Sequence, residues 1–81
     1  MGQHLGERAV SVAQSANQAH NAAVAIAESA RQAAVAAAGN NQAAVTAAEI
    51  AFYRACLASA KANGCGTEVF VTGLRSLGVN S

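Results

Sequence analysis

The chain has 81 residues, of which 23 are alanine and none is proline or tryptophan. Valine, leucine, isoleucine and phenylalanine together contribute only 16 residues, so we expect one small domain over residues 1–81 with a thin hydrocarbon core. The formal net charge is +1 and 11% of the residues are charged. This balance lacks the basic footprint of a nucleic-acid-binding protein, and we expect no nucleic-acid partner.

The apolar residues do not form a membrane span. The longest apolar runs, residues 22–27 and 33–38, have six residues each, whereas a transmembrane helix needs about 20. The first residues lack the charged and apolar regions of a secretory signal peptide. We therefore expect a chain that is cytoplasmic or packaged in an assembly and that has no transmembrane span. Contact with a membrane surface stays open.

A heptad pattern predicts a long helix over about residues 6–38. Apolar residues recur at alternating steps of four and three residues for almost five heptads, with polar residues opposite. Alanine has the highest helix propensity, and no proline interrupts the segment. The predicted packing positions are Leu5, Ala9, Val12, Ala16, Ala19, Ala23, Ile26, Ala30, Ala33 and Ala37.

A turn over residues 39–41 separates this helix from a second one. Gly39, Asn40 and Asn41 tolerate the backbone conformations of a helix end; one helix continuing through them is the alternative. The same heptad spacing then predicts a helix over about residues 42–63, which Asn63 and Gly64 end. Its packing positions are all alanine: Ala44, Ala48, Ala51, Ala55, Ala58 and Ala62.

The last segment, residues 64–81, differs in composition and is expected to be a short C-terminal arm. Thr67 can cap a helix in which Phe70, Leu74 and Leu77 share one face. The alternation of Val69 and Val71 instead favours a strand, and the sequence leaves helix or strand open for residues 67–78. In either form, we expect the arm to dock on an adjacent subunit through Val69, Phe70, Leu74 and Leu77.

These elements predict an all-α fold, an antiparallel helical hairpin with alanine-rich coiled-coil seams plus the C-terminal arm. A buried methyl group contributes about 0.8 kcal/mol, against about 1.5–3 kcal/mol for a larger aliphatic side chain. Helices that meet through alanine therefore approach closely, to an interaxial distance of about 8 Å, but bury little hydrocarbon. The first helix is also about ten residues longer than the second. We expect other copies or a partner to complete the fold.

The sequence offers no catalytic, cofactor-binding or metal site. His4 and His20 are too far apart to share a metal ion on one helix, and the chain has no aspartate for a hydrolytic triad. Cys56 and Cys65 do not form a Cys-x-x-Cys pair. They are expected to be free thiols, and a bridge between them near Gly64 is the alternative.

The function that fits this pattern is structural and non-enzymatic. We expect self-assembly with copies of the same chain, as a homo-oligomer or polymer, through close-packed alanine-rich helix faces. A filament, a ribbon or a virion-type lattice is consistent with such a chain. The alternatives are a small helical-bundle adaptor that completes a partner's bundle and a membrane-surface-active helix.

Overall fold

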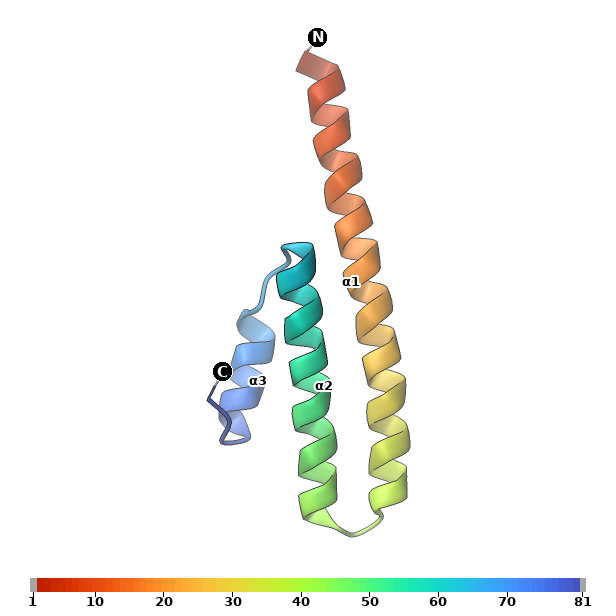
Figure 1. Ribbon diagram of the computed structural model, residues 1–81, viewed down its shortest axis with the longest axis vertical. Coiled ribbons are helices and arrows are strands. Elements are labelled where there is room, and N and C mark those ends of the chain that lie inside the picture. The colour runs from red at the N-terminus through yellow and green to blue at the C-terminus, as the bar shows by residue number, and fades with distance from the viewer. Residues whose placement is uncertain (1, 81) are drawn as a thin grey trace.

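The structure is a computed structural model that describes residues 2–80, and the side chains of residues 14–80. It contains three helices, α1 (Gly2–Ala38), α2 (Gln42–Asn63) and α3 (Glu68–Ser76), and no strand over residues 2–80. Figure 1 shows α1 and α2 antiparallel and side by side, with α3 returning along α2 on the side away from α1. The predicted all-α fold is confirmed.

The turn between α1 and α2 is set by residues within it. Gly39 adopts a φ of +58°, which only glycine reaches without strain. Asn41 has an extended backbone, and its side-chain oxygen accepts a hydrogen bond of 3.1 Å from the amide of Ala44. This is the N-cap interaction that begins a new helix. A continuous helix through residues 39–41 is therefore wrong.

The end of α2 is equally local in origin. Gly64 adopts a φ of +67°, and the next amide, that of Cys65, donates to the carbonyl of Ala60 at 2.8 Å. These are the features by which a left-handed glycine ends a helix. The chain then forms α3 rather than a strand. The helical alternative for the arm is the right one, although the Thr67 side chain makes no capping hydrogen bond.

The hairpin buries the predicted alanine positions only in part: Ala48 is buried and Ala16, Ala23 and Ala44 are half-buried, whereas most of the others are exposed. Several inward positions, among them Ala27 and Cys56, follow a predicted position by one residue. On α1 the positions turned inward are larger: Val24, Arg31 and Val35 are half-buried, whereas Ile26 is 71% exposed. On α2 the half-buried Phe52 and the fully buried Cys56 lie inward. These larger side chains bury more hydrocarbon than alanine does, and Ala27 and Ala48 are buried as well.

The buried core is correspondingly small. It consists of Ala27, Ala48, Cys56, Leu57, Ala60 and Leu74 among the residues whose side chains are described. Leu74 comes from α3 and is only 1% exposed, and α3 packs on α2 of its own chain. The expected insertion of Leu74 into an adjacent subunit is therefore corrected: its methyl groups are already covered within the chain. Phe70 and Leu77 are half-buried, and Val69 is 73% exposed.

Gly73 fixes how closely α3 approaches α2. A Cβ atom at this position would lie 2.6 Å from Cε1 and 2.7 Å from Cζ of Tyr53. These separations are shorter than van der Waals contact, so the Tyr53 ring packs directly on the α3 backbone. Gly66, in the connection before α3, has no atom within 4 Å of the same added carbon.

We expect Gly73→Ala to lower the free energy of unfolding by about 1 kcal/mol. Overpacking costs about 1–3 kcal/mol, and the better helix propensity of alanine offsets less than about 1 kcal/mol of this. Gly66→Ala is the matched control and should leave stability unchanged or raise it by up to about 1 kcal/mol. Urea unfolding followed by circular dichroism measures both; equal effects would contradict the contact with Tyr53.

Candidate interaction surface

The predicted alanine positions of α1 and α2 form part of a groove on one side of the hairpin. The groove has a volume of about 220 Å³. We call it the alanine groove; its lining residues are Ala27, Ala30, Arg31, Ala34, Ala48, Ala51, Phe52 and Ala55. Ala27 and Ala48 are buried, and Ala30, Ala34, Ala51 and Ala55 are exposed. Most of the alanines that line the groove are therefore exposed to solvent and are not buried between the two helices.

The other predicted packing positions vary in exposure. The side chains of Leu5, Ala9 and Val12 lie outside the described residues. Ala16, Ala23 and Ala44 are half-buried. The exposed positions that do not line the groove are Ala19, Ile26, Ala33, Ala37, Ala58 and Ala62. Packing within one chain thus leaves most of the predicted surface uncovered. Whether another subunit covers it stays a prediction.

Two residues that the heptad analysis did not single out as packing positions, Arg31 and Phe52, separate the alanine groove from a polar hollow. They line both, and Glu28, Glu49 and Tyr53 complete the hollow. The Arg31 guanidinium lies 5.7 Å from the centre of the Phe52 ring, a cation–π distance. Its Nε donates to Glu28 at 3.1 Å, and a second nitrogen donates to the other carboxylate oxygen. The charge at the groove is therefore neutralised within the chain.

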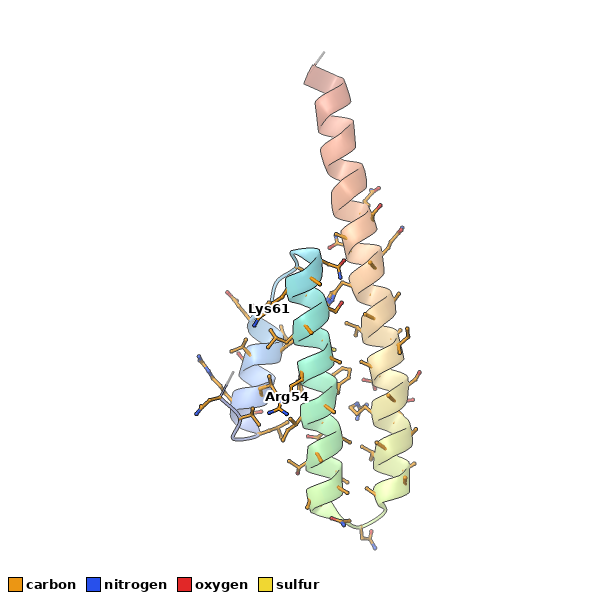
Figure 2. All side chains as sticks on the ribbon, in the orientation of Figure 1. Arg54 and Lys61 are labelled. Carbon is orange, nitrogen blue, oxygen red and sulfur yellow. The ribbon has the colours of Figure 1, made fainter. Side chains whose placement is uncertain are left out.

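The two basic side chains of α2 lie away from the groove. Figure 2 shows Arg54 and Lys61 projecting from α2 on the side where α3 lies. Both are exposed, and neither lines the groove. The surface that the two helices share is consequently apolar. Burying a polar group without a hydrogen-bond partner costs free energy. Covering this surface with another helix would bury few polar groups, so this cost would be small.

The ion pair predicts a pH dependence. Hydrogen bonding to Arg31 lowers the pKa of Glu28 below its ordinary value of 4.5 and raises the pKa of Arg31. A lowered carboxylate pKa stabilises the folded chain above the unfolded pKa, and this contribution is lost as the pH falls through the folded pKa. We expect Arg31→Gln to return the Glu28 pKa toward 4.5 in a carboxyl NMR titration. The matched control Arg54→Gln should leave it unchanged, and an equal response to both changes would contradict the pair.

Side chains from all three helices meet at the open end of the hairpin. His20 Nδ1 of α1 and Ser59 Oγ of α2 are 3.0 Å apart and share a hydrogen bond. The His20 ring also packs edge-on against Phe70 of α3, with ring centres 5.7 Å apart. Nearby, the Cys65 thiol donates to the Asn17 side chain at 3.5 Å. These contacts tie α3 and the end of α2 to the middle of α1.

His20 thus has a structural role at this junction. No group of three or more histidine, cysteine or acidic side chains suited to a metal ion occurs among the side chains that the structure describes. The side chain of His4 is outside that part of the chain. Both cysteines are free, so the alternative of a bridge between them is wrong. Cys56 is fully buried, and burial raises the pKa of its thiol.

The two thiols should differ sharply in reactivity. Because the thiolate is the reactive form, we expect a thiol reagent at pH 8 to label the half-buried Cys65 and to spare Cys56 until urea unfolds the chain. Mass spectrometry of the labelled protein reads out each site. Cys65→Ser should remove the fast reaction. Labelling of Cys56 at the same rate as Cys65 would contradict its burial.

No protein-family model, curated protein or solved structure matches the chain. Of the helices described, none is long and apolar enough to cross a membrane. A proposal about function therefore depends on the surface and shape of this chain alone.

Proposed function

We propose that the protein is a non-enzymatic structural protein that assembles with copies of itself through the alanine-rich faces of α1 and α2. The product would be a filament, a ribbon or a lattice. The observation that carries the proposal is an excess of exposed surface. The chain exposes 5578 Å², whereas a compact monomer of its mass exposes about 4,450 Å². The excess, about 1,100 Å², is larger than the roughly 800 Å² that each partner buries in a standard interface.

The excess surface arises from the shape of the hairpin. The radius of gyration is 16.1 Å, against about 11.7 Å for a compact domain of this length. The connection after α2 contacts α1 at Asn17, so residues 2–16 of α1 extend past the end of α2 (Figure 1). Most helical stability in proteins comes from packing, and this part of α1 has no helix of its own chain beside it (Figure 1). A neighbouring copy would provide the missing contacts.

The chemistry of the alanine groove favours a helix as its occupant. Alanine loses no side-chain entropy on burial, and its small side chain allows helix axes to approach to about 8 Å. At that separation the gain comes from many backbone and methyl contacts of about 0.1–0.2 kcal/mol each. A partner with a bulky face could not approach as closely.

The proposal predicts that assembly of the full chain depends on concentration and is sensitive to Ala51. Ala51→Leu places a larger side chain at the exposed rim of the groove. Overpacking costs about 1–3 kcal/mol, so we expect the concentration for half-assembly to rise about 5- to 150-fold. Light scattering and sedimentation velocity measure this shift. Ala25→Leu, at an exposed position of α1 outside the groove, should have no such effect.

Three outcomes would count against the proposal. A sharp monomer peak at high concentration in ultracentrifugation would overturn self-assembly. A single small oligomer that does not grow with concentration would favour a closed helical bundle. Leakage of liposomes at concentrations where the chain is monomeric would favour a membrane-surface role. Electron micrographs of the purified protein would distinguish a filament or ribbon from a lattice.

A further inference from the structure

We infer that residues 2–16 of α1 in one copy, the projecting segment, lie in the alanine groove of the next copy, so that copies join head to tail. The inference rests on the proposed self-assembly and names the two surfaces that meet. One is the part of α1 without a helix of its own chain beside it (Figure 1). The other is the groove, which no segment of its own chain occupies among the residues described.

The projecting segment has the length that the groove requires. Fifteen helical residues span about 22 Å at a rise of 1.5 Å per residue. The groove is lined on α1 from Ala27 to Ala34 and on α2 from Ala48 to Ala55, which is about 10 Å along each helix. A helix lying between two others contacts both of them. The segment therefore covers the full groove and has about two turns left over to contact the flanking surface.

The helical register of the segment suits a close approach. Gly2, Gly6, Ala9, Ala13 and Ala16 follow one another at steps of four and three residues. They continue along the helix the face of α1 that holds His20 and Ala27, the face that packs on α2. In the sequence of residues 2–16, these positions hold only glycine and alanine, the smallest residue types. Small residues on both surfaces let the backbones approach closely.

The charges and the surface area fit the same arrangement. Arg31 is the only ionisable residue that lines the groove, and Glu28 already pairs with it. The docked segment therefore needs no countercharge in the groove. The excess exposed surface of about 1,100 Å² per chain is shared by two surfaces in a polymer, so each head-to-tail contact buries about 1,100 Å² in total, near the low end for protein interfaces.

This contact joins two different surfaces. A heterologous contact of this kind repeats without closing unless the rotation between copies happens to form a ring. Each copy supplies one segment and accepts one, so the structure extends by one chain at a time. The geometry thus favours a linear filament over a lattice.

Two single variants of the full chain test the inference by complementation. Ala13→Glu places a charge on the small-residue face of the segment and leaves the groove intact. Ala51→Glu places a charge in the groove and leaves the segment intact. Glutamate is a good helix former, and circular dichroism verifies that both variants remain helical. Ala25→Glu, which touches neither surface, is the matched control and should assemble like the unaltered chain.

We expect each variant alone to be monomeric at concentrations where the unaltered chain polymerises. Mixed in equal amounts, they should form a dimer and nothing larger, because the intact segment of the Ala51→Glu chain meets the intact groove of the Ala13→Glu chain. Sedimentation velocity of the two solutions and of the mixture gives the result. The dimer should appear at the concentration at which the unaltered chain begins to assemble.

Other results overturn the inference in distinct ways. Polymerisation of Ala13→Glu alone would show that the segment is not used, and polymerisation of Ala51→Glu alone would show that the groove is not the receptor. Two variants that each dimerise alone, with no further species in the mixture, would show that each surface meets its own kind, and two monomeric variants whose mixture stays monomeric would show that the segment does not bind the groove. In all of these cases the unaltered chain still assembles, so the proposed function survives. A monomeric unaltered chain would instead overturn the proposed function itself.

Discussion

The size of the alanine side chain governs how this hairpin packs. A methyl group buries so little hydrocarbon that a pair of helices gains more by closing on a few larger residues. Val24 and Val35 on α1 and Phe52 and Cys56 on α2 are turned inward as a result. The alanines, although far more numerous, remain largely at the surface. The packing of these four side chains therefore determines which faces of α1 and α2 stay exposed.

The exposed alanine-rich face of α1 and α2 is suited to binding another helix. It is mostly apolar, it forms a groove about 220 Å³ in volume, and Glu28 neutralises the charge of Arg31, which lines the groove. Meanwhile α1 projects past the end of α2 (Figure 1). The same chain thus combines an uncovered groove with an uncovered helical segment. We propose that the segment of one copy binds the groove of the next. This contact would convert a marginal monomer into a stable polymer.

The C-terminal arm has a different role from the one expected of it. Leu74 is buried against the chain's own α2, and the absence of a side chain at Gly73 lets the Tyr53 ring pack on the α3 backbone. The edge-on contact of Phe70 with His20 adds a link to α1. The arm covers the side of α2 that the alanine groove leaves free. Val69 of the arm is 73% exposed and is free for another contact.

Local sequence patterns predict α1, α2 and the turn between them. Helix propensity, the glycines at residues 39 and 64, and the capping side chain of Asn41 act over a few residues, so local patterns predict them. The C-terminal arm combines a helical and a β-branched pattern, so its sequence leaves helix or strand open, and packing on α2 favours the helix. The tertiary structure decided which residues of α1 and α2 face each other. That choice depends on which large side chains meet across the hairpin, and a heptad of nearly identical alanines offers no local signal for it.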